Sequence, residues 1–281
     1  MGEDAAATKT APSSQQNANL EQIGEVGSNQ PWQWLAAGWE DLARARWTSV
    51  VWGLLFAGVG LGILLILHSY RLYNLALPLV AGFMLIAPIL AVGLYHVSRE
   101  IEHGRNVGMG TALGAWKRNT GQVALLGFVL GLFFLFWIRL ATLIFAVFFG
   151  QTPPEAFGTA PPDILTFIQS VVLSSENLGF LIVGTLIGAV LAVIVYAIAV
   201  VSAPMLVDRD VSVFHAIVTS VRAVQKNKKA MLLWGVLIVL VTGAGILAGF
   251  IGLAFTMPLV AHASWHAYRD LVPQPTNGSS D

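Results

Sequence analysis

The sequence predicts an all-α membrane protein, a polytopic bundle of six transmembrane helices. Three observations predict it: the composition is strongly apolar, the apolar residues form long runs, and the basic residues gather between alternate runs. Of the 281 residues, 56% are hydrophobic and 11% are charged, whereas about 25% are charged in a typical soluble domain. So few charged residues cannot cover a water-facing surface. The length leaves room for one large membrane domain.

Four apolar runs are each long enough to cross a bilayer, because about 20 apolar residues span roughly 30 Å of hydrocarbon. They are residues 47–67, 75–97, 122–149 and 178–207. A fifth run, residues 230–268, contains 39 residues. As one helix it would reach about 58 Å, which is roughly twice the bilayer thickness. We interpret it as two spans joined by a tight turn near residues 249–252.

The distribution of basic residues predicts that both termini are cytoplasmic, since Lys and Arg are enriched in cytoplasmic loops. The opposite side of the membrane holds only Arg71, and Arg139 lies within the third span. The outer loop, residues 150–177, has no base. The cytoplasmic segments hold thirteen of the fifteen basic residues: Lys9, Arg44, Arg46, Arg99, Arg105, Lys117, Arg118, Arg209, Arg222, Lys226, Lys228, Lys229 and Arg269.

The two ends of the chain are expected to be disordered cytoplasmic tails. Residues 1–30 are polar and lack the apolar run of a cleavable signal peptide. Residues 272–281 have a similar polar composition. The six-span membrane domain is therefore expected to cover residues 31–271, with an interfacial helix at 163–175 in the outer loop. Cysteine is absent, which excludes disulfide bonds and thiolate metal sites.

Internal similarity favours three repeats, each an amphipathic helix followed by a two-span hairpin. Residues 34–46, 110–118 and 214–226 mix apolar and basic residues at helical spacing, as interfacial helices do. Each of the three is followed by a span with glycine at an equivalent position: Gly53, Gly127 and Gly235. Repeats of one orientation are related by an axis along the membrane normal, as in some transporters.

The second and sixth spans end in the same pattern. Pro88 is followed at offsets of seven, eight, eleven and twelve by Tyr95, His96, Arg99 and Glu100; at the same offsets, Pro258 is followed by Trp265, His266, Arg269 and Asp270. Acidic residues at a helix C-terminus oppose the helix dipole. We therefore expect Glu100 and Asp270 to pair with bases, in an ion-pair belt that ties the repeats together.

Three further observations bear on chemistry. Arg139 is an ionisable residue inside a span, which indicates a functional site by default, but its position near the outer interface favours a snorkelling anchor.

His262 and His266 lie four residues apart on one helix face, and with His96 could ligate zinc or haem. The expected position of His96 and His266 at the cytoplasmic helix ends favours capping and interfacial hydrogen bonds. The sequence has no HExxH motif, phosphate-binding loop, nucleophile elbow, paired-carboxylate site or nucleic-acid patch.

Three runs carry a resemblance to a known family: LALPLVAGFMLIAPILAVGLYHVSRE, SAPMLVDRDVSVFHAIVTSVRAV and MPLVAHASWHAYRDLV. Over about residues 31–271 the chain resembles the bacterial integral membrane family catalogued as domain of unknown function 2189. The most specific parts are residues 265–270 and the turn 208–210. The resemblance implies a bacterial inner membrane location. Some members of that family are labelled as cytochrome c oxidase subunits, but mid-span histidine pairs are missing here.

The sequence favours a non-enzymatic membrane component that associates with lipid or with a larger assembly, and it indicates no catalytic residue, cofactor or metal site. Membrane lipids and other membrane subunits are the expected partners, and nucleic acid is not. The repeats and the prolines leave a small-solute transporter or channel as one alternative. His96, His262 and His266 leave an accessory subunit of a respiratory oxidase as another.

Overall fold

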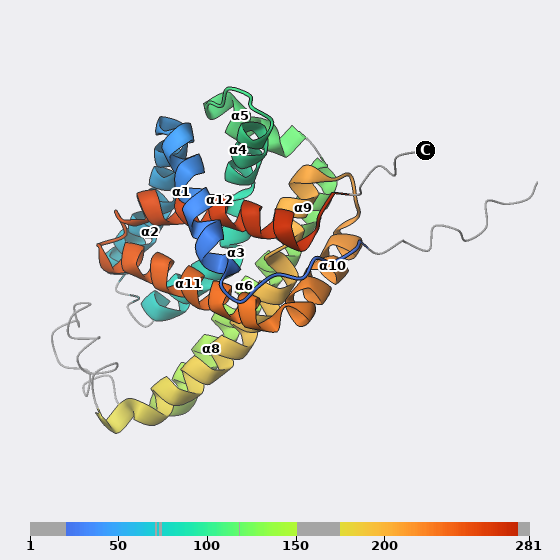
Figure 1. Ribbon diagram of the computed structural model, residues 1–281. Coiled ribbons are helices and arrows are strands. Elements are labelled where there is room, and N and C mark those ends of the chain that lie inside the picture. The colour runs from blue at the N-terminus through green and yellow to red at the C-terminus, as the bar shows by residue number, and fades with distance from the viewer. Residues whose placement is uncertain (1–20, 71, 73–74, 118, 151–174, 275–281) are drawn as a thin grey trace, which may run out of the picture.

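The computed structural model describes residues 21–70, 72, 75–117, 119–150 and 175–274 (Figure 1). Within these ranges the regular structure is helical and contains no strand, so the all-α prediction is confirmed. The helices are α1 (Gln30–Ala45), α2 (Trp47–Tyr70), α3 (Ala76–Leu90), α4 (Val92–Glu102), α5 (Met109–Gly114), η2 (Ala115–Lys117), α6 (Thr120–Phe149), η5 (Ser175–Asn177), α8 (Leu178–Ala199), α9 (Ser202–Asp208), α10 (Val213–Lys226), α11 (Lys228–Leu247) and α12 (Leu253–Leu271).

Five stretches of the described residues are long and apolar enough to cross a membrane, one fewer than the six predicted. They are Trp47–Tyr70, Ala76–Glu102, Thr120–Phe149, Ser175–Asp208 and Lys228–Leu247. The sixth predicted span is α12, which forms a helix in the expected place. Its second half is too polar to count, because it carries two histidines, an arginine and an aspartate. Figure 1 shows α12 in the middle of the bundle, and most of its residues are buried.

The predicted hairpin between the last two helices is confirmed. α11 ends at Leu247 and α12 begins at Leu253. Gly249 and Phe250 both have positive φ angles, of 70° and 65°. A left-handed conformation ends a helix and reverses the chain, and glycine adopts it at little cost. The tight turn therefore falls where the length of the apolar run required it.

Prolines divide two of the even-numbered spans but not the third. α3 carries Pro88 near its end, and α4 begins after Ala91. α8 ends at Ala199, and Pro204 lies in the first turn of α9, where the missing N–H is not needed. Pro258 lies inside α12, which continues through it. The matching proline offsets in α3–α4 and α12 therefore do not produce matching breaks.

The packing follows the cyclic pattern that three repeats predict. Each amphipathic helix packs against the second span of the preceding unit: α1 against α12, α5 against α4, and α10 against α8 and α9. The three equivalent glycines follow the same rule. Gly53 approaches Ala254 of α12, Gly127 approaches Ile89 of α3, and Gly235 approaches the ring of Tyr196 in α8. A pseudo-threefold arrangement accounts for both observations.

Residues 21–29, here called the N-terminal strap, correct one prediction. Their polar composition predicted disorder, yet the strap runs as an ordered extended segment beside α10 and α12. The Gly24 N–H donates to the carbonyl of Leu271 at 2.9 Å, and the Val26 N–H donates to Asn227 Oδ1 at 2.9 Å. Ile23 is buried. Backbone hydrogen bonds, which composition does not reveal, hold the strap in place.

Val272 at the other end of the chain is also buried, although the sequence places it in the C-terminal tail. The remaining predictions for the tails concern residues 1–20 and 275–281, which lie outside the described residues. The predicted interfacial helix at 163–175 also lies outside them, apart from Ser175.

Gly53→Val is expected to lower the free energy of unfolding by about 3 kcal/mol. A Cβ at this position would collide with the backbone carbonyl of Ala254, so α2 and α12 would have to separate. Unfolding in detergent micelles, followed by tryptophan fluorescence, measures the effect. Gly58→Val is the matched control, because a Cβ at Gly58 in the same helix meets no atom within 4 Å. Equal stability of the two variants would contradict the close approach.

Candidate functional site

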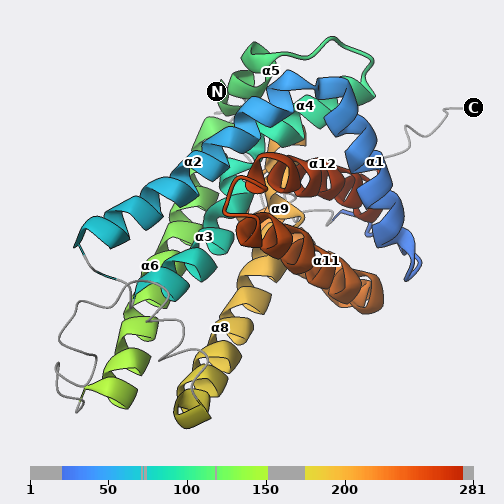
Figure 2. The ribbon, with the colours of Figure 1, turned by 90° about the vertical axis from the view of Figure 1, so that its left-hand side faces the viewer.

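Polar and charged side chains gather where α1, α4, α9, α10 and the second half of α12 meet, here called the polar end. Figure 1 shows these elements in one part of the bundle, and Figures 1 and 2 show the far ends of α6 and α8 projecting away from it. The amphipathic helix α1 crosses α12 closely. A Cβ on Gly38 would lie 2.6 Å from the backbone nitrogen of Ala263. This approach brings the polar side chains of α1 and α12 into contact.

Five side chains at the polar end form one hydrogen-bonded chain, here called the histidine relay. Its members, in order, are Ser49 of α2, His262 of α12, Ser98 of α4, Asp41 of α1 and His266 of α12. The successive distances are 2.8, 2.7, 2.7 and 2.9 Å. The first four members are buried, whereas the His266 side chain is 29% exposed. The relay therefore links four helices and reaches solvent at one end.

The donors and acceptors of the relay have one consistent arrangement. An ionised carboxylate only accepts, so the Ser98 hydroxyl and His266 Nε2 both donate to Asp41 Oδ2. Because the Ser98 hydroxyl hydrogen is donated to Asp41, Ser98 Oγ can only accept from His262, so His262 Nδ1 is the donor. In neutral His262 the other ring nitrogen, Nε2, then accepts from the Ser49 hydroxyl. Each buried polar group in the relay is satisfied, which is what a buried network needs to be stabilising.

The surroundings of Asp41 favour its charged form. Burial alone would raise the pKa of this carboxyl group, but hydrogen bonds from His266 and Ser98, and the charge of His266, outweigh burial and lower the pKa below its usual value. A folded-state pKa below the unfolded one means that the ionised group stabilises the fold. That contribution is present above the unfolded pKa and is lost as pH falls through the lower folded pKa.

The lowered pKa of Asp41 predicts a pH dependence that Asp41→Asn removes. The difference in melting temperature between wild type and this variant is expected to be present at about pH 5 and to shrink below about pH 4. Thermal unfolding in detergent over this pH range measures it. Glu40→Gln is the control, because Glu40 is exposed on the same helix. A difference that grows on acidification would contradict the assignment.

A second group of charges, here called the axial ion cluster, joins the three repeats. Asp208 at the end of α9 is its centre, and its side chain is 6% exposed. Arg99 Nε donates to Asp208 Oδ1 at 3.0 Å, and Arg269 Nη1 lies 3.5 Å from Oδ2. Arg269 also pairs with Glu102 at 2.8 Å. Arg99 and Arg269 occupy matching positions in two repeats, and they converge on one carboxylate of the third.

Arg209, the neighbour of Asp208, holds the ends of the chain to this cluster. Its guanidinium pairs with Glu21 at 2.6 Å and donates to Tyr268 Oη at 2.9 Å. It also donates to the carbonyls of Val272 and Pro273, both at 3.0 Å. Burial alone would lower the pKa of Arg209, but the hydrogen bond to Glu21 and the nearby charges raise it overall. Arg209 therefore keeps its charge, and all three of its guanidinium nitrogens are already engaged within the chain.

The ion-pair belt expected from the sequence forms in part. Glu100 pairs with Arg99 at 3.2 Å and with Arg105. Asp270 pairs with no base in the part of the chain that the structure describes. Its Oδ2 accepts from Gln30 Nε2 at 2.8 Å and from Trp34 Nε1 at 2.7 Å instead. The reason is that α1 packs against α12, which brings Gln30 and Trp34 within hydrogen-bond distance of the Asp270 carboxylate.

The other predicted site residues are dispersed. His96 is half-buried in α4, near the charge of Glu100, and is not part of the relay. His262 is fully buried in the middle of α12. Arg139 is exposed on α6, far from the polar end, and has no ion-pair partner among the described residues. It lies 19 residues after Thr120, or about 29 Å along the helix. This placement agrees with an anchor near the outer interface.

Sequence reasoning missed Asp41, Ser49, Ser98 and Asp208 as members of polar networks. Asp41 carried a usable signal. Within α1 it shares a helical face with Trp34, Gly38 and Ala45, all of which are buried. A single carboxylate on an otherwise apolar face must find a buried partner. Ser49 and Ser98 carried no such signal, because serine is ordinary in membrane helices.

His262 has no ring nitrogen to offer a metal or haem while the relay is intact, since Ser49 and Ser98 engage both. Nor do the described residues contain a group of three or more His, Asp or Glu side chains that could hold a metal ion. The arrangement can do two things chemically. It satisfies buried charges, and it couples the positions of the helices that carry them.

These features define the class: the chain is an integral membrane protein built from several apolar helices, with a polar end that joins its repeats. Comparison with known families agrees. The model of the family described as "Predicted integral membrane protein (DUF2189)" matches residues 76–208. The resemblance inferred from the sequence is thereby confirmed, over a narrower range than residues 31–271. No curated protein and no solved structure matches the chain. The matched range contains Arg99, Glu100 and Asp208.

Proposed function

We propose that the protein is a non-enzymatic component of the bacterial inner membrane that associates with lipid or with a larger membrane assembly. The observation that carries the proposal is the contrast between its two kinds of surface. At the polar end the charges of the relay and the axial ion cluster are satisfied within the chain. The spans, in contrast, present long apolar faces that no other part of the described chain covers.

The hairpin of α6 and α8 shows this contrast most clearly. Phe128 of α6 is 63% exposed, and Leu186 and Val193 of α8 are 62% and 65% exposed. Figure 2 shows the two helices extending together beyond the rest of the bundle. Apolar faces of this extent are stable only against hydrocarbon or another apolar protein surface. This supports lipid and membrane subunits as the partners, with the side chains of the polar end serving to hold the repeats together.

The positive-inside rule supports an orientation with both termini in the cytoplasm. Basic residues at the ends of α1, α4, α9 and α10 share the polar end, whereas Arg139 lies toward the other. A reporter fused after Asp281 is expected to be active in the cytoplasm, and one inserted near Gly158 outside it. Signals from the same side for both fusions would contradict this topology.

Native mass spectrometry of the protein, extracted gently from its own host, tests the proposed function. Bound phospholipid or stoichiometric protein subunits are the expected result. A folded protein with neither bound phospholipid nor protein subunits would overturn the proposal and favour the transporter alternative. The same spectrum separates the alternative of an oxidase accessory subunit, since bound haem or oxidase subunits would change the mass. Both ring nitrogens of His262 are hydrogen-bonded to serines, which disfavours haem ligation at that residue.

A further inference from the structure

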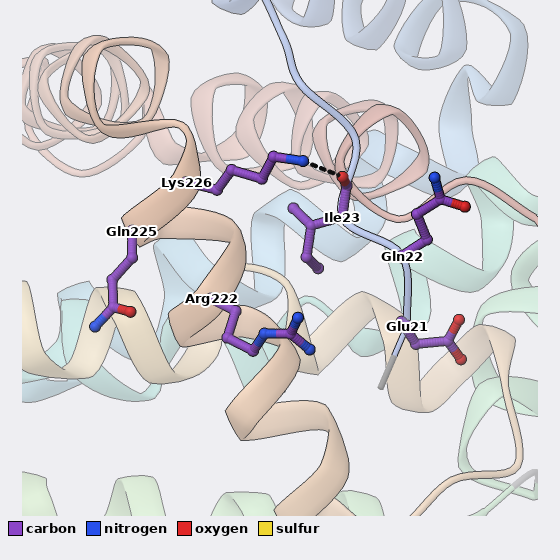
Figure 3. Close-up of a pocket in the computed structure, with 6 residues that line it drawn as sticks. All are labelled: Glu21, Gln22, Ile23, Arg222, Gln225 and Lys226. Atoms are coloured by element: carbon purple, nitrogen blue, oxygen red, sulfur yellow. Dashed lines mark hydrogen bonds between the residues drawn. The ribbon is translucent and has the colours of Figure 1, made fainter. Parts of the chain in front are cut away.

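A groove lies between α10 and the N-terminal strap, away from the relay and the axial ion cluster. Its volume is about 630 Å³, and it is lined by Glu21, Gln22, Ile23, Arg222, Gln225 and Lys226. Figure 3 shows the Arg222 side chain extending from α10 into the space beside Ile23 and Glu21. Lys226 reaches across the groove and donates to the Ile23 carbonyl at 2.9 Å.

Arg222 is a cation with no ion-pair partner among the residues that the structure describes. Its Nη1 is buried and makes no hydrogen bond, and the described residues provide no ion pair for its guanidinium. Every other arginine of the polar end that is as buried as this one, such as Arg99, Arg209 and Arg269, pairs with a carboxylate. A charge with a buried nitrogen is stabilised by a counter-ion. The half-buried Arg222 guanidinium therefore favours an anion at this site.

Two further orphaned atoms lie on the same flank of α10. His215 Nε2 and Thr219 Oγ1 are buried without a hydrogen-bond partner. Residues 215, 219, 222 and 226 follow helical spacing and so share one side of the helix. Of these four residues, Arg222 and Lys226 line the groove, and the Arg222 guanidinium is the group there with unmet hydrogen-bonding capacity.

The nearest carboxylates leave the groove positively charged. Glu21 is engaged by Arg209 at 2.6 Å, and its other oxygen lies 4.0 Å from His215. Glu25 lies 3.3 Å from Lys226, but its side chain is 81% exposed, and an exposed pair of this kind contributes little. An anion entering the groove would therefore meet Arg222 unpaired and Lys226 only weakly held.

The opposite flank of α10 is apolar and continues from the groove. Phe214 is 75% exposed, and Val218 and Val221 are half-buried beside it. An amphipathic helix with cations on one flank and exposed apolar side chains on the other lies in a membrane interface. There, a headgroup phosphate would sit at the cationic flank while its acyl chains follow the apolar flank.

We propose that Arg222, with Lys226, binds the phosphate of an anionic phospholipid in this groove. The guanidinium fork matches two phosphate oxygens, and the ammonium group adds a second cation. The strap forms the opposite wall, so lipid binding also holds the strap against α10. This inference rests on the proposed association with lipid and names the residues that would carry it.

The test uses the full chain in detergent, with phosphatidylglycerol as the anionic probe and phosphatidylcholine as the zwitterionic one. Wild type is expected to bind phosphatidylglycerol more tightly by native mass spectrometry and to gain melting temperature when it is added. Arg222→Gln is expected to bind phosphatidylglycerol roughly tenfold more weakly and to lose that gain. Arg44→Gln is the matched control, because Arg44 is exposed and paired with Glu40 at 3.4 Å, and it should behave as wild type.

The lipid-free melting temperature shows whether Arg222→Gln folds. It should equal that of wild type, because Arg222 makes no ion pair with the described residues that the substitution could remove. Unchanged phosphatidylglycerol binding by Arg222→Gln would overturn this site while leaving the proposed lipid association in place. Binding of no lipid by wild type would overturn both. Arg222-dependent binding of inorganic phosphate, without any of phosphatidylglycerol, would overturn the lipid assignment in favour of a soluble phosphate.

Discussion

Asp208→Ala is expected to lower the free energy of unfolding by about 4 kcal/mol, the largest effect of any single substitution at the polar end. Its carboxylate accepts from Arg99 and, at 2.8 Å, from the Tyr268 hydroxyl, and it lies beside Arg269. Removing it leaves two arginines short of a counter-charge and one buried hydroxyl without an acceptor. Denaturant unfolding in micelles measures the change, and the 9 tryptophans provide the signal.

Asp210→Ala is the control for this prediction. Asp210 lies two residues away in the same Asp-Arg-Asp turn but is exposed, so its loss should change stability by less than about 0.5 kcal/mol. Asp208→Asn should fall between the two, because an amide keeps one acceptor oxygen but not the charge. If Asp208→Ala and Asp210→Ala unfold alike, the axial ion cluster does not join the repeats.

The architecture was predictable because each of its determinants is periodic or additive. The length of the run 230–268 against the bilayer thickness required a turn, and the turn lies at Gly249 and Phe250. Three amphipathic stretches and three glycines predicted the repeats, and the packing of α1, α5 and α10 follows them. The count of six spans was less secure, because α12 is polar in its second half and buried by its neighbours rather than by lipid.

The polar networks were only partly predictable, since they depend on where helices cross. The matching offsets of Arg99 and Arg269 indicated an ion-pair belt, and both residues do reach Asp208. Nothing in the spacing along the chain shows that α1 crosses α12 at Gly38. That crossing places Asp41 against His266 and Trp34 against Asp270. The strap was missed for a similar reason, because Asn227 and Leu271 bond its backbone.

The charged and hydrogen-bonding groups of the polar end are thus satisfied in two networks but not on the flank of α10. Every charged side chain of the relay and the axial ion cluster has a partner of opposite charge or a hydrogen bond within the chain, so these networks explain stability without a ligand. The flank of α10 with Arg222 has orphaned donors, so it is where a ligand would change the protein most. Substitutions in the first two networks should alter unfolding whatever the lipid, whereas Arg222→Gln should alter unfolding only when an anionic lipid is present.

His262→Ala is expected to lower the free energy of unfolding by about 3 kcal/mol, through a cavity and through lost hydrogen bonds. His262 is fully buried, and its removal leaves the Ser49 hydroxyl without an acceptor and Ser98 Oγ without a donor. Unfolding in micelles measures the loss. His103→Ala is the control, because His103 is exposed and bonds only the carbonyl of Arg99 in its own helix.

A double-mutant cycle separates the relay from simple packing. Ser49→Ala and His262→Ala should be coupled by about 1 kcal/mol, since each removes the same hydrogen bond. Ser69→Ala replaces Ser49→Ala in the control cycle, because the Ser69 hydroxyl is exposed and bonds the carbonyl of Leu65 in its own helix. It should show no coupling to His262→Ala. Strict additivity in the first cycle would mean that His262 stabilises the fold by filling space, and that the hydrogen-bonded order inferred for the relay is wrong.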